Sequence, residues 1–341
     1  MVVGIGLLVN AVLVAIPIGG SVGALMGIDA HRSATGQKPL FTGGTDDDSG
    51  SIGNGGGSNG GTHGGSEVVP DNDGISRISK CDMSYGIIPP SKTEQYTLNP
   101  NPWGVKAGSD DGELCLDVLM WNNASYPTNT APEFSVTWQY DQGPISAPVH
   151  AYPNIRVDDV LPKKMSAVKE LYVDVHWTYG VGKNKSAETT DIDALKDINL
   201  STNVAIDMFL DTDKEKAENG TNAKFEVMVW FWMSSVAAQP HGWSNPGKNK
   251  TIEGQTFTLF QDKNNEGTMV LSWVARPFLT DALEKFTGDI YPLISDLYTT
   301  DNDDYPSSDD YLGSLSFGSE AYDVKEHVTF SVPKYEISIK T

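Results

Sequence analysis

The stretch KFEVMVWFWM, residues 224–233, decides the fold class because its residue types alternate with a period of two. Successive side chains of a β-strand leave opposite faces. One face is wholly apolar and carries Phe225, Val227, Val229 and Phe231. The other face carries Glu226, Met228, Trp230 and Trp232. A strand with one apolar face is typical of a sandwich, where that face packs in the seam between two sheets.

The same short alternating pattern recurs through most of the chain, between clusters of Gly, Asn, Asp and Pro. The clearest segments are ELYVDVHWTY (170–179), NVAIDMFLD (203–211), QTFTLFQ (255–261), TMVLSWVA (268–275), SLSFGSE (314–320) and HVTFSV (327–332). The stretch 278–298 instead places Leu279, Leu283, Phe286 and Ile290 near helical spacing, which predicts the single helix. The sequence therefore predicts an all-β fold, a two-sheet antiparallel β-jelly roll with one short helix.

Charge and composition exclude several classes of protein. The 341 residues contain 24 Lys and Arg against 45 Asp and Glu, a formal net charge of −21. Such a chain has no basic surface for the phosphates of a nucleic acid, so we expect no nucleic-acid partner. Its six histidines form no H-x-H or H-E-x-x-H motif, and no G-x-S-x-G elbow is present. We therefore expect no metal, no cofactor and no serine nucleophile.

The N-terminal part of the chain differs from the rest. Residues 1–30 are almost wholly apolar or glycine, and about 20 apolar residues suffice to cross a bilayer as a helix. We favour an uncleaved anchor over a signal peptide, because no Lys or Arg precedes the run, and we expect a longer natural N-terminus. Residues 31–80 are rich in Gly, Ser and Asp and predict a disordered linker. We expect residues 81–341 to form the folded jelly-roll domain.

Secretory passage is indicated by five N-x-S/T sequons, at Asn123, Asn184, Asn199, Asn219 and Asn249. Two cysteines, Cys81 and Cys115, would pair most simply with each other in an oxidising compartment, although two buried thiols are the alternative. We expect an extracellular domain, either secreted or tethered to the membrane through the N-terminal segment alone.

Carboxylates in alternating strands are the candidate catalytic groups. Glu226 shares a strand face with large aromatic and thioether side chains, where a charge is costly without a partner. Glu320 follows small residues on its own face, which leaves room for a ligand, and Asp207 sits in mid-strand among apolar residues. Each has a structural alternative: a surface glutamate, a glutamate that holds a lysine, or a buried acid that caps a loop.

Together the motifs resemble glycoside hydrolase family 12, the endo-β-1,4-glucanases and xyloglucan-specific endoglucanases. The resembling pieces are YTLNPNPWG (96–104), WQYDQG (138–143), PVHAYPNI (148–155), NVAIDMFLD (203–211), EVMVWF (226–231) and LSFGSEAY (315–322). The resemblance implies a concanavalin-like jelly roll with a concave substrate cleft and a retaining mechanism. It implies Glu226 as nucleophile, Glu320 as acid/base and Asp207 as the acid that assists the nucleophile.

The resemblance also implies substrate contacts and a disulfide. Trp103 matches a stacking tryptophan, Met228 a residue beside the nucleophile, and Cys81 with Cys115 an N-terminal disulfide. Aromatic rings stack on sugar faces, and we count Trp138, Trp230, Asn154 and Pro240 among the further candidates. The chain departs from the family at Ser319, where many members have Thr, and at Ala321-Tyr322-Asp323, where Pro-Phe-Thr-Gly is commoner.

A retaining mechanism needs two carboxyl groups about 5–5.5 Å apart. We expect Glu320 to hold its proton while Glu226 is charged, and an acidic pH optimum. The sequence thus predicts a monomeric retaining endo-glycosidase that acts on a polysaccharide, a β-1,4-glucan such as cellulose, mixed-linkage glucan or xyloglucan. A non-catalytic carbohydrate-binding jelly roll at the cell surface is the alternative, as is a surface or signalling protein recognised by a partner.

Overall fold

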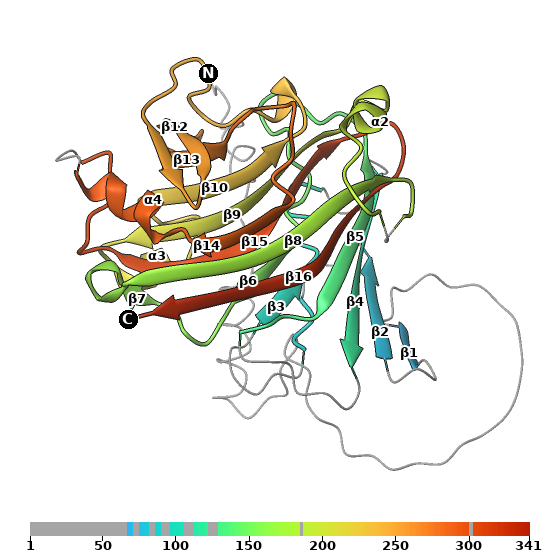
Figure 1. The fold of residues 1–341 in the computed structure, drawn as a ribbon, viewed down its shortest axis with the longest axis horizontal. Coiled ribbons are helices and arrows are strands. Elements are labelled where there is room, and N and C mark those ends of the chain that lie inside the picture. The colour runs from blue at the N-terminus through green and yellow to red at the C-terminus, as the bar shows by residue number, and fades with distance from the viewer. Residues whose placement is uncertain are drawn as a thin grey trace, which may run out of the picture.

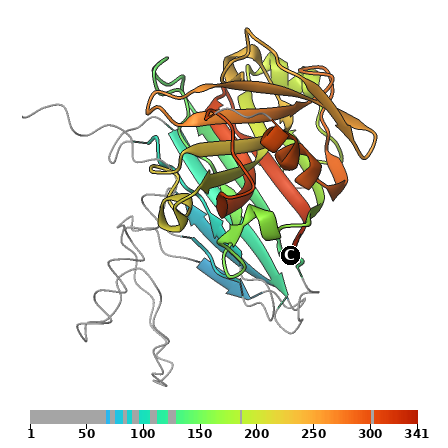
Figure 2. The same cartoon turned by 90° about the vertical axis from the view of Figure 1, so that its left-hand side faces the viewer.

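Two β-sheets form the fold in the computed structural model (Figures 1 and 2). The model describes residues 67–70, 75–81, 86–89, 96–105, 112–121, 129–184, 187–299 and 303–341. The expected N-terminal anchor, Asn123 and most of the expected linker lie outside these residues. No helix in the described ranges is long and apolar enough to cross a membrane.

The described strands divide into a seven-stranded and a nine-stranded sheet. The seven-stranded sheet has the order β1 (Glu67–Pro70), β2 (Ile75–Cys81), β4 (Gly112–Trp121), β5 (Glu133–Tyr140), β16 (Val328–Lys340), β8 (Glu170–Val181) and β14 (Lys285–Asp289). The other has the order β11 (Asn249–Ile252), β12 (Gln255–Lys263), β13 (Met269–Ala275), β10 (Phe225–Met233), β9 (Ser201–Asp211), β15 (Tyr311–Asp323), β6 (Asn154–Val157) and β3 (Tyr96–Asn99), and β7 (Lys163–Lys164) pairs with β15. All the pairs are antiparallel except β10 with β13, which is parallel.

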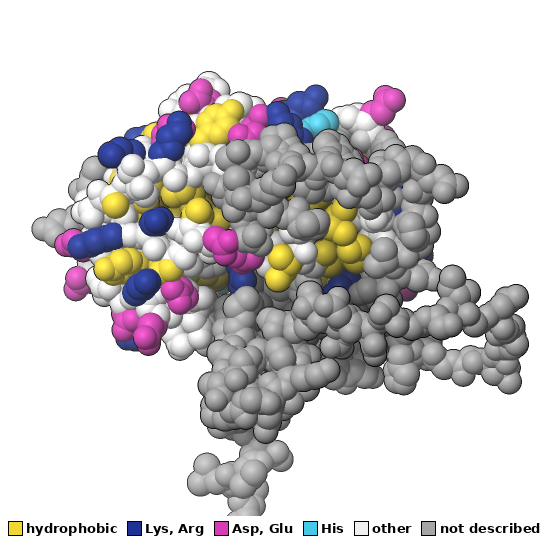
Figure 3. All heavy atoms as spheres, turned by 90° about the horizontal axis from the view of Figure 1, so that it is seen from below, with side chains coloured by type: hydrophobic (Ala, Val, Ile, Leu, Met, Phe, Trp, Pro, Cys, Tyr) yellow, Lys and Arg dark blue, Asp and Glu magenta, His cyan; other side chains and the backbone are white. Residues whose placement is uncertain are grey.

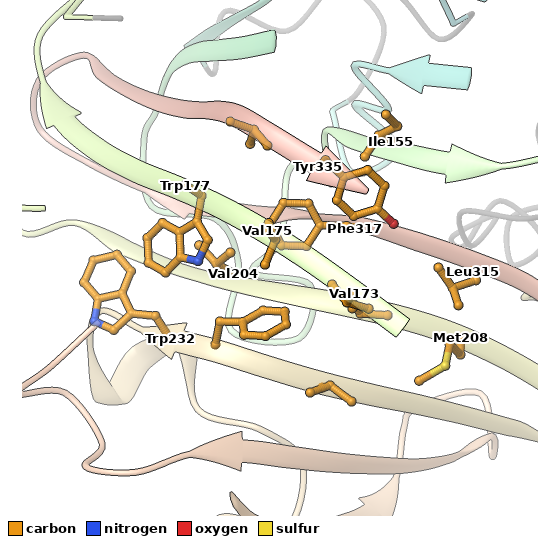
Figure 4. Packing of buried hydrophobic residues seen from close by; sticks show 14 of the residues in the cluster. Ile155, Val173, Val175, Trp177, Val204, Met208, Trp232, Leu315, Phe317 and Tyr335 are labelled. Atoms are coloured by element: carbon orange, nitrogen blue, oxygen red, sulfur yellow. The ribbon is translucent and has the colours of Figure 1, made fainter. Parts of the chain in front are cut away.

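The core fills the space between the two sheets. Trp177 and Val175 of β8 meet Phe317 of β15 and Val204 of β9 in this layer (Figure 4). Each of these side chains is at most 1% exposed. Burial of this apolar layer stabilises the sandwich by about 25 cal/mol for each Å² removed from water. The two-sheet β-sandwich expected from the alternating pattern is confirmed.

The expected helix over 278–298 is wrong for most of its length. Leu279 has a left-handed φ of 65°, and residues 285–289 form β14, which pairs with β8. Phe286 alternates with polar neighbours, as in a strand at a sheet edge, and pairing with β8 overrides the helical spacing. The described residues contain short helices only: α2 (Ile192–Asp197), α3 (Lys214–Ala217) and α4 (Tyr291–Ser295), and the 3₁₀ turns η1 (Met165–Ala167), η2 (Val236–Ala238) and η3 (Asp296–Thr299).

The alternation on β10 is interrupted before its end. A β-bulge between Trp230 and Trp232 shifts the register against β9, so Phe231 and Trp232 both enter the core. The Trp232 ring stacks on Trp177 with centroids 5.9 Å apart (Figure 4). The expectation that Trp232 shares a face with Glu226 is therefore wrong, because a period of two cannot reveal an extra residue.

The folded sheet begins earlier in the chain than the expected domain start at residue 81. β2 pairs with β4 from Ile75 to Cys81, and β1 pairs with β2. Residues 67–70 and 75–80 are therefore part of the folded sheet, although we expected a disordered linker up to residue 80. The hydroxyl- and charge-rich sequence ISRISKC carries few apolar residues because it lies near the sheet edge, so it resembles a linker in composition.

Candidate active site

Three neighbouring strands carry the three candidate acids on one face of the nine-stranded sheet. β10 pairs with β9, and β9 pairs with β15 (Figure 1). Alternate residues, such as Val227 and Ile206, are buried between the sheets. Glu226, Asp207 and Glu320 therefore lie on the opposite face, which we call the outer face.

The strand register staggers these acids. Glu226 pairs with Phe209, whereas Glu320 pairs with Asn203, further along β9. Asp207 lies between these two levels. Burial raises the pKa of both Asp207 and Glu226, and the charge on Glu320 raises both further. The three carboxyl groups thus share one electrostatic environment.

Three features make the surroundings of Glu226 unfavourable for a negative charge. Burial is the largest cause, followed by the charges of Glu320 and Glu266, and together they raise its pKa from 4.5 to about 8. Glu266 lies in the turn between β12 and β13, beside the end of β10 at which Glu226 sits. No described residue makes a hydrogen bond to the Glu226 carboxyl group, so its negative charge is not stabilised locally.

Asp207 is almost completely enclosed. It is 1% exposed, and its Oδ1 atom has no hydrogen-bond partner among the described residues. Burial, and then the charge of Glu226, raise its pKa well above the usual range. A buried carboxyl group beside two others favours its protonated form, which can donate a hydrogen bond.

Glu320 differs from Glu226 in having two donors. Asn203 donates from Nδ2 to the Oε2 atom of Glu320, and the Tyr322 hydroxyl donates to the same atom at 3.2 Å. Burial raises the pKa of Glu320, while these two hydrogen bonds lower it. The Asn203 side chain also accepts from the Glu320 backbone N–H at 3.3 Å, so it holds the residue at two points.

These contacts favour the proton on Glu226, whereas the sequence led us to expect it on Glu320. Donated hydrogen bonds stabilise the ionised form of Glu320, whereas Glu226 receives none and faces two other charges. In the unliganded site the shared proton therefore prefers Glu226. Interacting carboxyl groups titrate as a unit, and a pKa of about 8 keeps Glu226 protonated at neutral pH, beside the protonated form that burial favours at Asp207.

Apolar side chains cover part of the outer face beside Glu226. Met228 and Trp230 follow Glu226 on β10 and are 4% and 2% exposed. They form a cluster with Phe260, on which Trp243 stacks with centroids 5.0 Å apart. The Trp230 indole donates to the Met228 sulfur at 3.3 Å. Both residues thus lie on the acid-bearing face, and their contact with substrate stays a prediction.

Trp103 lies on the Glu320 side of the site. It packs, half-buried, against Val149, Ala238 and Tyr322. Its indole Nε1 atom has no partner among the described residues. An indole with a partly open ring is suited to stack on a sugar ring.

Trp138 is placed differently from the expectation. It is 0% exposed, within the core between the sheets, and its indole donates to the Tyr179 hydroxyl at 3.1 Å. Tyr179 in turn bonds the Ser319 hydroxyl at 2.7 Å, on the core side of β15. The prediction that Trp138 binds substrate is therefore wrong: it supports the back of the strand that carries Glu320.

The other predicted residues have mixed outcomes. Asn154 is 3% exposed, pairs with Gly318, and donates from Nδ2 to the Tyr152 carbonyl at 2.6 Å, so part of its amide is used within the fold. Pro240 is buried after η2. Contact of either residue with substrate stays a prediction.

Cys81 and Cys115 form the expected disulfide across a directly paired position of β2 and β4. Asn184, Asn199 and Asn249 are exposed and Asn219 is half-buried, so glycosylation of these sites stays a prediction.

No group of three or more His, Cys, Asp and Glu side chains within the described ranges could hold a metal ion. Two surface hollows, of about 280 and 520 Å³, lie around Arg276 and Pro277, and neither is lined by the candidate acids. On the face shown in Figure 3, Lys and Arg side chains lie among Asp and Glu side chains and form no continuous basic surface.

Sequence reasoning missed three residues of the site. Asn203 and Tyr322 share the parity of Asp207 and Glu320 on their strands, so the alternation that identified the acids could have found them. Glu266 lies in a turn, where no periodic pattern exists to identify it.

Comparison with known proteins relates most of the chain to one family. The model of glycosyl hydrolase family 12 matches residues 94–340. A xyloglucan-specific endo-β-1,4-glucanase A of Aspergillus aculeatus is 23% identical over 72% of this chain and 86% of its own, and an endoglucanase A of Aspergillus kawachii is 22% identical over 72% and 87%.

Solved structures agree on the fold. Endoglucanase 3 of Trichoderma harzianum superposes with a TM-score of 0.57 at 24% identity, covering 77% of this chain and 97% of its own. A family 12 xyloglucanase of Bacillus licheniformis gives a TM-score of 0.55 at 16% identity, with 77% of this chain and 99% of its own covered. The family model spans well over half of the 341 residues, so this chain belongs to glycosyl hydrolase family 12.

Proposed function

We propose that the chain is a retaining, endo-acting glycoside hydrolase that cleaves internal β-1,4-glucosidic bonds of glucans. The observation that carries this proposal is the sharing of one electrostatic environment by Glu226, Glu320 and Asp207 on the outer face. A non-catalytic sugar-binding sandwich would use aromatic rings but would have no reason to gather two half-buried glutamates around a buried aspartate.

The proposed reaction has two steps. In the first, a carboxylate oxygen of Glu226 attacks the anomeric carbon, the glycosidic C–O bond breaks, and Glu320 gives its proton to the leaving oxygen. In the second, ionised Glu320 takes a proton from water, whose oxygen attacks the same carbon and releases Glu226. Both steps need the productive arrangement with Glu226 ionised and Glu320 protonated at the start.

Substrate binding must therefore move the proton. The unliganded site favours the proton on Glu226, and the productive form is the minor one. A glycosidic oxygen placed at Glu320 would accept a hydrogen bond from its protonated carboxyl group, and so favour the proton on Glu320. Asp207 in its protonated form could donate to Glu226 and so favour the ionised nucleophile. We therefore assign Asp207 a role in setting the protonation state of Glu226.

Glu226→Gln is the direct test of the nucleophile. Gln keeps the size of the side chain and cannot attack, so we expect a loss of at least about 10³-fold in kcat on soluble mixed-linkage β-glucan, read by a reducing-end assay. Circular dichroism and urea unfolding serve as the control for the fold. Substantial activity in a verified Glu226→Gln preparation would rule out this assignment.

The stereochemistry tests the retaining mechanism. Proton NMR of the first products from a cello-oligosaccharide should show the β-anomer before mutarotation, because two inversions at the anomeric carbon restore its configuration. An α-anomer formed first would show an inverting enzyme.

The preferred glucan is a separate question. The relative from A. aculeatus is named for xyloglucan, and that from A. kawachii is named only as an endoglucanase. We propose that β-1,4-glucans are the substrate class and that xyloglucan belongs in the panel with cellulose and mixed-linkage glucan. Branched substrates need width in the cleft, which we expect loops such as 141–150 and 239–250 to set.

We further propose that the catalytic domain is a monomer that works outside the cell, linked through residues 31–66 to an N-terminal anchor or signal. The support is the disulfide between Cys81 and Cys115, which persists in oxidising compartments, together with three exposed sequons. Peptide sequencing of the secreted and membrane fractions, with glycosidase treatment, tests this arrangement.

A further inference from the structure

Tyr322 is the one ring hydroxyl among the described residues that donates to a candidate catalytic carboxyl group. Its Oη atom lies 3.2 Å from Oε2 of Glu320. Tyr322 is 7% exposed, so its side chain is largely buried beside the half-buried Glu320. Its position falls in the Ala321-Tyr322-Asp323 segment, where the sequence departs from the family pattern.

The fold fixes this ring from several sides. Tyr322 lies two positions after Glu320 on β15, so its side chain is on the outer face beside Glu320, and a β-bulge between Ala321 and Asp323 follows at the same point of the strand. The Tyr322 carbonyl contacts Nδ1 of His150 at 2.7 Å, and His150 stacks on Tyr140 with centroids 4.7 Å apart.

The ring itself packs against Trp103, Val149 and Ala238. Trp103 is the predicted sugar-stacking residue, so the Tyr322 ring connects that tryptophan to the carboxyl group of Glu320. A ring held by packing and a hydroxyl with one acceptor give a fixed hydrogen bond rather than a fluctuating one.

We propose that Tyr322 is a positioning residue that holds the Glu320 carboxyl group and favours its ionised form, and so sets the pH range over which Glu320 can act as an acid. This inference rests on the proposed function. Tyr322 does not touch the reacting atoms. It acts on the reaction only through Glu320.

Other groups also face Glu320 and must be counted. Asn203 of β9 donates to the same oxygen, and Asp207 of β9 and Glu226 of β10 carry the neighbouring carboxyl groups. The phenol of Tyr152, which precedes β6, is coupled to the charge of Glu320 as well. Of the two donors to Glu320, only Tyr322 can lose its donor without a change of side-chain shape.

The phenol remains a donor over the working pH range. Burial, and then the charge of Glu320, raise the pKa of Tyr322 well above its ordinary value of 10. A neutral phenol beside a carboxyl group stabilises the carboxylate and not the acid. Removal of the hydroxyl should therefore make Glu320 hold its proton to higher pH.

Tyr322→Phe tests the proposal by the pH profile. We expect the acidic limb of kcat/KM on soluble mixed-linkage β-glucan to move to higher pH by about one unit, since a hydrogen bond to a charged group has about that effect on a pKa, while the basic limb, which Glu226 sets, stays in place. The plateau value should not fall, because a proton held more firmly by Glu320 enlarges the productive form and Phe keeps the ring that packs against Trp103. A merely structural role would lower the plateau and leave the limb in place.

Tyr335→Phe is the matched control. Tyr335 is 1% exposed in the core between the sheets, and its hydroxyl has no hydrogen-bond partner among the described residues. This variant also removes one buried phenolic oxygen, but in the core between the sheets, so its acidic limb should coincide with that of the wild type.

A titration independent of activity completes the test. In the full chain labelled with ¹³C-glutamate, the carboxyl carbon of Glu320, assigned by its loss in Glu320→Gln, should titrate at higher pH in Tyr322→Phe than in the wild type. Equal titration in both overturns the inference, as does an equal limb shift in Tyr335→Phe. Absence of β-glucan hydrolysis in the wild type would instead overturn the proposed function, and the titration would still decide the role of Tyr322.

Discussion

At the scale of single residues, Glu226 links catalysis to stability. Its pKa is about 8 in the folded chain against 4.5 as the ordinary value, so the folded state keeps a proton that the unfolded state has lost. Stability is then greatest below about pH 4.5 and falls as the pH rises toward 8, because the charged form is penalised only in the folded state. The site is thus built at a cost to the fold.

Urea unfolding at pH 5 and pH 8 measures this cost. We expect the free energy of unfolding of the wild type to fall between these two pH values by about 2–3 kcal/mol more than that of Glu226→Gln, which cannot ionise. Parallel pH dependence of the two proteins would contradict a raised pKa at Glu226. The same pKa moves the expected upper end of the activity range to near pH 8, above the acidic optimum that the sequence indicated.

The alternation of single residues was informative about the site, within limits. It placed Glu226 and Glu320 on the faces opposite their apolar neighbours, and the structure has both on the outer face. It could not identify Trp138 as a core residue, because both faces of β5 are largely buried and the pattern of EFSVTWQY does not tell them apart. Nor could it give the hydrogen bonds to Glu320, which depend on the pairing of β15 with β9.

At the scale of elements, the contact of β15 with β6 fixes the position of Glu320. Gly318 lies opposite Asn154, and a Cβ atom on it would meet the Pro153 carbonyl oxygen at 2.2 Å and the Asn154 Cβ at 2.8 Å. The Pro153 oxygen belongs to the backbone, so a larger residue must push the two strands apart.

Gly318→Ala should therefore lower both stability and activity. We expect a loss of about 1–3 kcal/mol in the free energy of unfolding from overpacking, and a fall in kcat larger than that in the control Gly247→Ala. Gly247 has its nearest atom, the Leu259 carbonyl oxygen, at 3.1 Å, so the neighbour has to yield only slightly. Equal effects of the two substitutions in unfolding and in kcat would disprove the steric argument.

Features that depend on pairing with distant strands were harder to predict than strands with a clear alternation. The spacing of Leu279, Leu283, Phe286 and Ile290 favoured a helix, yet the pairing of β14 with β8 imposes a strand. The bulges at Trp230 and Ala321 are likewise products of pairing between strands. Features that arise from contacts distant in sequence leave no local periodic signal.

At the scale of the whole molecule, the disulfide links β2 to β4, next to the edge strand β1 of the seven-stranded sheet. Cys81 and Cys115 are 34 residues apart in the sequence. A crosslink of this span restricts the unfolded chain and contributes about 3–4 kcal/mol in the chain-entropy model. The sandwich class and the disulfide were both predictable, because alternation and cysteine number are properties of the sequence itself.

Reduction measures that contribution. The wild type should lose about 3–4 kcal/mol of its free energy of unfolding in dithiothreitol, because the unfolded chain regains its freedom. Cys115→Ser should show the same lower value with and without reductant. A wild type that is insensitive to reductant would show that the crosslink adds nothing to the fold.

The place of this crosslink also determines how the domain responds to force. β2 runs from Ile75, opposite Trp121, to Cys81, opposite Cys115. Drag on a tethered enzyme would peel the strand away rung by rung from the Ile75 end, and the covalent sulfur bridge lies at the last rung. The released strand would lengthen the tether by roughly 20 Å, and the disulfide would then stop further unfolding. An applied force would therefore disrupt the edge of the sheet before it reached the strands that carry the acids.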